Sequence, residues 1–234
     1  MTTFAFAVLF MFAQRPEPGA PLPPVMVVSG SAQILAVPDE ATVRLGIVRQ
    51  ASVAQAAQEQ TNAIAQEILN AIGKLGVPQQ QIQTARLVLA PVYAPRSPDS
   101  RDAPRIVAYV ATNTVSIRLD NLSMIGSVID AGLKTGANQL DGVQFGLRND
   151  LPAREEALKG AVLEARSKAQ VMADALRVNL NDVLEVSEGG VSVAPRAEQG
   201  MAARVMAIDA ITPVSPGQME IRANVTIRYR ISPR

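Results

Sequence analysis

The chain has 234 residues, of which 48% are hydrophobic, and it sets 22 Lys and Arg against 21 Asp and Glu. It contains no His, Cys or Trp. This excludes disulfides, thiolate or imidazole metal sites and catalytic triads with a His base. A Ser–Lys pair or paired carboxylates remain open. The balanced charge predicts no nucleic-acid partner, because such proteins usually carry a clustered basic surface.

Residues 1–24 are expected to be a signal-like segment and a Pro-rich tether outside the folded domain. Residues 4–13 (FAFAVLFMFA) are too few to cross a bilayer but have the length of the hydrophobic region of a signal peptide. Met11 stands where a small residue should precede cleavage, and no basic residue precedes the run. The alternative is an uncleaved apolar tail or lipid anchor that associates with a membrane. The Pro-rich residues 15–24 predict a stiff tether.

A first group of elements is predicted between residues 25 and 120. Ser52 and Gln55 match a capping box that would open a helix, and Gly76 offers a left-handed end. Apolar residues at three- and four-residue spacing predict the buried stripe of this helix as Val53, Ala57, Ile64, Ile68, Ile72 and Leu75. Strands are predicted over residues 25–37, 40–49, 83–93 and 105–119.

A second group follows a short bridging helix over residues 122–134, which Asp120 or Asn121 would cap. A strand over 143–147 leads to a long helix. Its buried stripe is predicted as Leu158, Val162, Ala165, Ala169, Met172 and Leu176. Apolar and polar residues alternate strictly over 219–231, which indicates a long strand with one buried face.

Three matches in the same order indicate an internal repeat. Offsets of 100, 101 and 110 relate residues 43–47 to 143–147, 75–77 to 176–178, and 115–118 to 225–228. We therefore predict an α+β fold of two repeated β-α-β-β halves, with antiparallel sheet, helices packed on one face and an extra N-terminal strand. The domain is placed at residues 25–231, its first half at about 25–120 and its second at about 137–231.

Several short segments resemble a known family. Val28-Ser29-Gly30 is followed by residues 38–41 (PDEA), residues 75–77 (LGV) precede a predicted strand, and residues 212–217 (TPVSPG) precede the last strand. In this order they resemble the SIMPL-domain family, which includes bacterial periplasmic immunogenic proteins of unassigned role. The resemblance spans residues 25–231. Ala32 departs from the pattern, because relatives usually carry Gly there, and this affects a bend rather than chemistry.

The resemblance carries expectations that the composition and spacing do not supply. It implies an exported protein of the periplasm or outer envelope, an α+β fold and large ring-like homo-oligomers. It also implies a loose link to tolerance of oxidative or envelope stress. It supplies no catalytic residues and no cofactor.

The loop before the last strand is a candidate interaction segment. Residues 195–217 are too many and too apolar for a plain hairpin loop. Either the loop folds back over the sheet, or another subunit buries it. The apolar residues of this candidate loop are Met201, Val205, Met206, Ile208 and Ile211.

Four arginines on repeat-related strands are a candidate anion-binding face. They are Arg118, Arg222, Arg228 and Arg230. The alternative is a solvated or salt-bridged face of the sheet, since surface charges often do no more than keep the exposed side wet.

Catalytic and metal sites have little support in the sequence. Ser29 and Ser31 flank Gly30, but the second Gly of a nucleophile elbow and a His base are absent. The acidic residues lack the spacing of a calcium loop. We therefore expect no cofactor, no metal and no enzyme activity, and a likeness of fold is not itself a likeness of activity. The expected function is a self-assembling envelope protein. The alternatives are a binding module for a small or anionic envelope ligand and a carboxylate hydrolase.

Overall fold

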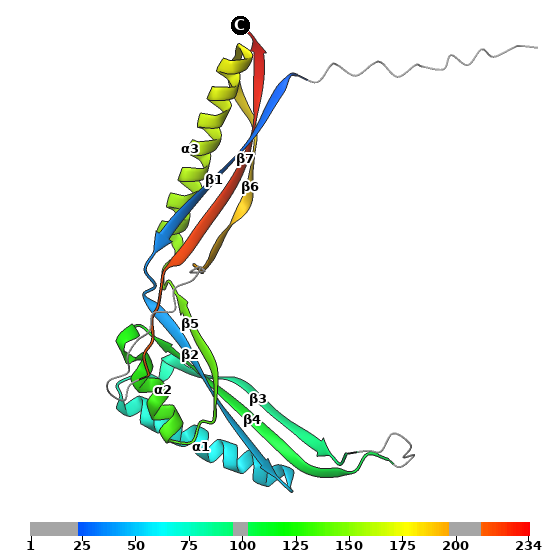
Figure 1. Ribbon diagram of the computed structural model, residues 1–234, viewed down its shortest axis with the longest axis vertical. Coiled ribbons are helices and arrows are strands. Elements are labelled where there is room, and N and C mark those ends of the chain that lie inside the picture. The colour runs from blue at the N-terminus through cyan, green and yellow to red at the C-terminus, as the bar shows by residue number, and fades with distance from the viewer. Residues whose placement is uncertain (1–22, 96–102, 197–211) are drawn as a thin grey trace, which may run out of the picture.

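The computed structural model describes residues 23–95, 103–196 and 212–234, and it arranges them in two antiparallel sheets with α-helices. Each sheet and its helices form one arm of a bent, elongated molecule (Figure 1). We call the four-stranded arm the first module and the three-stranded arm the second module. The predicted α+β class and the antiparallel pairing are confirmed, and the structure adds that the sheet is divided in two.

The first module is a sheet in the order β3-β4-β2-β5. Its strands are β2 (Glu40–Ala51), β3 (Ile82–Tyr93), β4 (Ile106–Leu119) and β5 (Gln139–Gly146). Helix α1 (Ala54–Lys74) packs mainly on β4 and β2, and α2 (Ile125–Lys134) packs on α1 and β2. Alternate residues of the two central strands point at these helices and are buried, among them Val43, Leu45, Ile47, Val115, Ile117 and Leu119.

The start of α1 differs from the prediction. The capping box of Ser52 and Gln55 is wrong, because the residue at the N-cap is Val53, which makes no side-chain cap hydrogen bond. Gln55 Nε2 donates to Glu59 Oε1 instead, at 2.7 Å. Strand β2 runs on to Ala51, two residues beyond its predicted end, so only two residues remain to turn the chain into the helix.

Both predicted helix ends in this module are confirmed. Gly76 follows α1 with a φ of +89°, the left-handed conformation that favours glycine. The bridging helix forms as a short 3₁₀ turn, Leu122–Met124, followed by α2. Its cap is Asn121, whose side chain accepts a hydrogen bond from the backbone N–H of Ser123 at 3.1 Å.

The second module is a sheet in the order β1-β7-β6, with helix α3 (Leu151–Leu176) on one face. Its strands are β1 (Val25–Ala36), β6 (Val178–Pro195) and β7 (Met219–Pro233). The predicted alternation along β7 is confirmed. The buried side comprises Met219, Ile221, Ala223, Val225, Ile227 and Tyr229.

Helix α3 packs through alanines rather than through the large apolar residues that were predicted. Five alanines at four-residue spacing are at most 1% exposed: Ala157, Ala161, Ala165, Ala169 and Ala173. The predicted stripe shares two residues with this set, and Leu158 packs against the core. Its other members, Val162, Met172 and Leu176, are exposed.

The reason is that α3 approaches the β1 backbone closely. A Cβ added at Gly30 would lie 2.1 Å from the backbone oxygen of Ala161. A Cβ added at Gly160 would lie 2.8 Å from the Cβ of Ala32. Only methyl-sized side chains fit between a helix and a sheet at this separation, so the larger residues are turned outward.

Two strands, β1 and β5, lie in a different module from the segment that follows each of them in the sequence. β1 precedes the first module in sequence, yet it pairs with β7 over its whole length, from Val25 opposite Arg230 to Ala36 opposite Met219. β5 begins the second repeat, yet it pairs with β2, where Val143 lies opposite Val43. Both modules nevertheless show one pattern, because β2-β4-β3 with α1 corresponds to β1-β7-β6 with α3.

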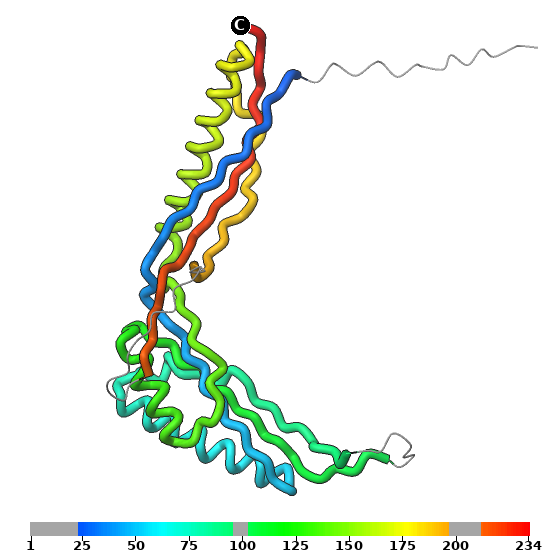
Figure 2. Tube along the Cα trace, in the orientation of Figure 1, coloured from blue at the N-terminus to red at the C-terminus, as the bar shows by residue number. Residues whose placement is uncertain are grey.

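A few short contacts join the modules at the bend, where the trace of β1 continues into β2 (Figure 2). Asp39 N–H donates to the Gly146 carbonyl at 3.1 Å, and Asp39 Oδ1 accepts from Arg148 N–H at 2.7 Å. Phe145 packs against the hydrophobic cores of both modules. The residues after β5 are therefore fixed to the turn after β1.

Candidate functional site

The predicted interaction loop lies outside the described residues. This applies to all five of its apolar residues, Met201, Val205, Met206, Ile208 and Ile211. The segment that follows is anchored on the first module before β7 begins. Thr212 Oγ1 donates to Asp130 Oδ1 of α2 at 2.8 Å, and Val214 packs on the core of that module.

The four predicted arginines do not form one face. Arg222, Arg228 and Arg230 lie on β7 in the second module, whereas Arg118 lies on β4 in the first. Two of the β7 arginines are paired: Arg222 with Glu220 at 2.7 Å, and Arg228 with Glu185 of β6 at 3.6 Å. For these two, the salt-bridged alternative describes the surface better than an anion-binding face does.

Arg118 instead shares a shallow polar pocket with Arg44. The pocket lies on the face of the first sheet that points away from the helices. Arg44 of β2 is opposite Ser116 of β4, and Thr42 is opposite Arg118, so the two arginines are diagonal neighbours. The pocket has a volume of about 260 Å³, and the remaining lining groups are the hydroxyls and amides of Thr42, Ser116, Gln80, Gln81 and Gln83.

The nearby carboxylates are bonded to other groups. Asp120 pairs with Arg148 at 3.2 Å and accepts a hydrogen bond from Gln81 at 2.8 Å. Asp141 accepts hydrogen bonds from Thr114 and Gln139, at 3.3 and 2.6 Å. Within the described part of the chain, no carboxylate oxygen lies within 4.0 Å of the guanidinium groups in the pocket.

A second surface is the outer half of the β3–β4 hairpin. Helix α1 covers β4 and β2 but makes little contact with β3, and the hairpin runs out beyond the helices (Figure 1). Nearly every residue of β3 is exposed. We call the exposed apolar residues of this hairpin the open ribbon: Leu87, Val88, Leu89, Tyr93, Ile106 and Val107.

Strand β6 is the corresponding outer strand of the second module, and α3 packs less on it than on β1 and β7. Most of its 18 residues are exposed, and Val183, Leu184 and Val186 are its large exposed apolar residues. It also carries three acidic residues, Asp182, Glu185 and Glu188. Its pairing with β7 shifts register three times, and such bulges hinder the addition of a further strand at a sheet edge.

Two side chains of α3 bond to backbone groups of β1, the other edge of the second sheet. Glu164 of α3 accepts a hydrogen bond from the Ser31 backbone N–H, and Lys168 Nζ donates to the Ser29 carbonyl at 3.3 Å. Glu164 and Lys168 also form an ion pair at 3.0 Å. The hydrogen bond from Ser31, followed by the contact with Lys168, lowers the pKa of the Glu164 carboxyl. These contacts occupy backbone groups that could otherwise pair with another strand.

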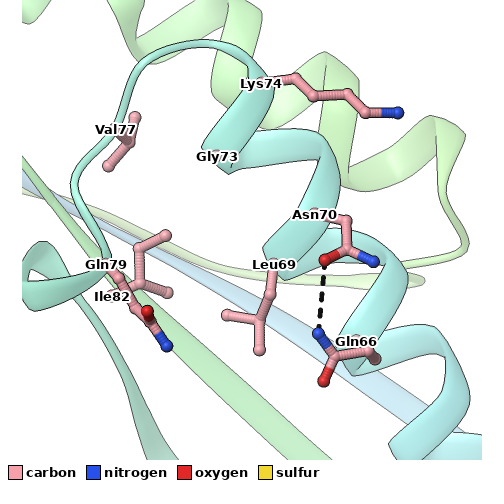
Figure 3. Close-up of a pocket in the computed structure, with 8 residues that line it drawn as sticks. All are labelled: Gln66, Leu69, Asn70, Gly73, Lys74, Val77, Gln79 and Ile82. Carbon is pink, nitrogen blue, oxygen red and sulfur yellow. Dashed lines mark hydrogen bonds between the residues drawn. The ribbon is translucent and has the colours of Figure 1, made fainter.

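A further groove lies between the end of α1 and the start of β3 (Figure 3). Its volume is about 700 Å³, and Leu69, Val77 and Ile82 supply its apolar side chains. Around them stand amide groups, and Gln66 Nε2 donates to Asn70 Oδ1 at 3.3 Å. Lys74 is the one ionisable residue in the lining. The groove therefore holds no pair of groups suited to acid–base chemistry.

A comparison with protein families identifies the chain. Residues 26–229 match the model of the SIMPL family, described as a protein of unknown function (DUF541). The chain belongs to the SIMPL family. The match spans both modules, from β1 to β7.

Among its relatives, this SIMPL protein is 30% identical over 215 residues to the 26 kDa periplasmic immunogenic protein of Brucella melitensis, covering 89% of the chain and 85% of that relative. It is 28% identical over 178 residues to the uncharacterized protein YggE of Edwardsiella ictaluri, covering 76% and 73%. It is 29% identical over 164 residues to YggE of Escherichia coli, covering 70% and 65%. The names place one relative in the periplasm and assign no activity.

The serines considered as nucleophiles have structural contacts in the SIMPL chain. Ser29 Oγ lies 3.0 Å from Thr226 Oγ1, and Lys168 reaches only the Ser29 backbone. Across the described ranges, no group of three or more acidic residues is arranged to hold a metal ion. No described helix has both the length and the apolar character needed to span a bilayer.

Two features of these surfaces, Arg44 and the open ribbon, were not predicted from the sequence. Arg44 could have been found, because it alternates with Val43 and Leu45 and must point to the polar face. The open ribbon could not, because β3 carries the apolar residues of an ordinary buried strand. Its exposure depends on where α1 lies.

Proposed function

We propose that this SIMPL protein is a non-enzymatic protein of the bacterial cell envelope that works by assembling with copies of itself. An exported location is supported by the periplasmic relative at 30% identity. The apolar residues 4–13, which lie outside the described residues, have the length of a signal-peptide core and agree with this location.

The open ribbon is the observation that carries the proposal. Leu87 is 55% exposed and Leu89 44%, and they pair with the buried β4 residues Asn113 and Ala111 on the helix side of the sheet, where α1 extends little over β3. Large exposed apolar side chains on one protruding hairpin, with Leu87 and Leu89 on the same face, are a surface that a partner can bury. The hairpin protrudes from the first module, so a second chain can reach it (Figure 1).

A second copy is the partner that the surfaces favour. Among the described residues of the hairpin, the charged ones near the open ribbon are basic, Arg86 on the strand face opposite to Leu87 and Arg105 just before β4, whereas β6 carries acidic residues beside exposed Val183, Leu184 and Val186. Apolar contact with opposite charge favours ribbon against β6 over ribbon against ribbon. A contact between two different surfaces repeats from copy to copy and closes into a ring when the rotation allows it.

The mass of the particle in solution tests the proposal. We expect size-exclusion chromatography with light scattering to give a multimer for the mature wild-type chain. The Leu87→Gln/Leu89→Gln variant should give smaller species, because two apolar contacts of the interface become polar. Val171→Gln is the matched control, since Val171 is 66% exposed on α3 and outside the proposed contact. A monomeric wild type, or equal dissociation of both variants, would contradict the proposal.

A charge exchange tests the choice of β6. Arg86→Glu and Glu188→Lys should each weaken the multimer, because each places like charges across the contact. The double variant should recover part of the wild-type mass. If the double variant does not regain any of the wild-type particle mass, β6 is not the partner surface. The Leu87→Gln/Leu89→Gln variant would then decide separately whether the open ribbon is an interface.

A role in tolerance of oxidative or envelope stress forms part of the proposal. It is tested by expressing the wild type or the Leu87→Gln/Leu89→Gln variant in a strain that lacks the gene, followed by challenge with peroxide. Equal survival would separate the stress role from assembly.

The alternative function, binding of a small anionic envelope ligand, is favoured by the pocket of Arg44 and Arg118.

A further inference from the structure

Two arginines face one polar pocket, and neither forms a salt bridge with a described residue. Arg44 and Arg118 project from neighbouring strands on the face of the first sheet away from the helices, and the hydroxyls of Thr42 and Ser116 lie between them in the register. Ser116 is only 5% exposed, so it lies at the floor of the pocket. The guanidinium groups are exposed and stand at the rim.

Three carboxylates lie near the pocket on the described part of this face. Asp120 is paired with Arg148, Asp141 accepts a hydrogen bond from Thr114, and Glu40 shares the polar face of β2 with Thr42. Asp141 is more than 4.0 Å from both arginines. Arg44 has one long hydrogen bond, from Nη2 to Gln144 Oε1 at 3.4 Å. Most guanidinium N–H groups in the pocket therefore remain able to donate to a ligand.

The donor set matches a phosphate group better than a carboxylate. A carboxylate has two oxygens, which one guanidinium fork can satisfy. A phosphate presents more acceptor oxygens in several directions, so it can accept from two arginines and from hydroxyls at the same time. The volume of about 260 Å³ leaves room for a small group attached to the phosphate.

We propose that the pocket of Arg44 and Arg118 is a binding site for a phosphate group carried by a small molecule or a lipid headgroup. Arg44 and Arg118 clamp the phosphate oxygens from two strands, and Ser116 and Thr42 donate from the floor. Asp141 weakens binding through its negative charge. The site belongs to the first module alone, so it does not depend on the proposed self-assembly.

Titration with inorganic phosphate tests the site, with ³¹P NMR or calorimetry as the readout and ionic strength held constant with sodium chloride. We expect saturable binding by the wild type and a loss of about tenfold in affinity for Arg44→Gln or Arg118→Gln, as for a hydrogen bond to a charged group. The affinity of Arg118→Lys should lie between those of the wild type and Arg118→Gln, because lysine keeps the charge but loses the planar fork of two N–H donors. Asp141→Asn should bind more tightly, by about twofold to fivefold for one exposed charge.

Arg222→Gln is the matched control, since it removes one exposed arginine from the other module, where Glu220 already pairs with it. Its affinity should equal that of the wild type. If Arg222→Gln and Arg118→Gln lose equal affinity for phosphate, the effect comes from the overall charge of the protein, and the proposal is wrong. An absence of saturation with both inorganic phosphate and the vesicles described below would also overturn the proposal.

Vesicles distinguish the two sources of the phosphate group. Wild type and Arg44→Gln/Arg118→Gln are sedimented with vesicles of phosphatidylglycerol and phosphatidylcholine, and with phosphatidylcholine alone. Phosphatidylglycerol-dependent sedimentation that the double variant loses supports the site and assigns a lipid headgroup. Saturation by inorganic phosphate without such sedimentation supports it and assigns a soluble phosphate. The double variant should keep the wild-type particle mass, so a failed assembly test and a failed binding test remain distinguishable.

Discussion

Replacement of Gly30 by alanine tests the close packing of α3 on β1. The added Cβ would lie 2.1 Å from the Ala161 oxygen and 2.5 Å from the Ala165 nitrogen, whereas ordinary contact begins at 3.4 Å. The larger overlap is therefore about 1.3 Å, from 3.4 less 2.1. Both atoms belong to the helix backbone and cannot rotate away. Helix α3 must move outward by about 1 Å, which loosens the buried alanine stripe.

The expected cost follows from known overpacked cores. Extra methylene groups in a well-packed core cost about 1–3 kcal/mol, and a clash with backbone on a rigid element belongs at the upper end. Alanine also restricts the unfolded chain, which returns about 0.5–1 kcal/mol. We therefore expect Gly30→Ala to lower the free energy of unfolding by about 2 kcal/mol.

Urea unfolding followed by far-ultraviolet circular dichroism measures this change, because a lower midpoint at constant slope is a loss of stability. Gly73→Ala is the matched control. Gly73 lies in helix α1 with open space around its would-be Cβ, so alanine should stabilise by about 0.5 kcal/mol. Trimming Ala165 to Gly in the Gly30→Ala background should not restore stability, since backbone atoms remain in the way. An unchanged midpoint for Gly30→Ala would refute the close-packing argument.

Three further predictions follow from local features. Arg177 ends α3 in the left-handed conformation with a φ of 55°. Because glycine adopts this conformation without strain, Arg177→Gly should raise the free energy of unfolding by about 0.5–1 kcal/mol in the same urea assay. A lower free energy of unfolding for this variant would contradict the prediction. The folded-state pKa of Glu164 lies below its usual 4.5, so its contribution is present above about pH 4.5 and lost as the pH falls through the folded value. The difference in urea midpoint between wild type and Glu164→Gln should therefore shrink below about pH 4.5, and a constant difference would count against the contact with Ser31. Ile117 is fully buried in the first module, so Ile117→Ala should cost about 3 kcal/mol, measured against the exposed control Val27→Ala at under 1 kcal/mol.

The secondary structure was largely predictable because it depends on local patterns. The alternation over 219–231 predicted β7 and its buried face, since a period of two permits only one face toward a core. The predicted buried face of α3 was wrong because the prediction favoured large apolar residues over the regularly spaced alanines. Alanines recur every four residues from Ala157 to Ala173, and Gly30 offers the backbone approach that such a stripe needs.

The pairing of distant strands could not be predicted. The match of residues 43–47 with 143–147 is real in sequence, yet β2 and β5 lie side by side in one sheet. Sequence offsets indicate which segments are related, but they do not determine which copy completes which sheet. The same limit applies to the candidate sites. Arg118 was selected for its likeness to Arg228, whereas the neighbour that gives it a pocket is Arg44, on a strand that the repeat does not relate to it.

The pairing of β1 with β7 bears on when the chain can fold. Val25 and Arg230 face each other across the sheet although 205 positions separate them, so the first strand to leave a ribosome or a membrane pore must wait for the last. Such distant pairing slows folding. A chain cut before β7 leaves β1 without its neighbour, and no contiguous fragment contains all three strands of that sheet without the whole first module. The second module can therefore reach its native form only after the last residues of the chain have become available.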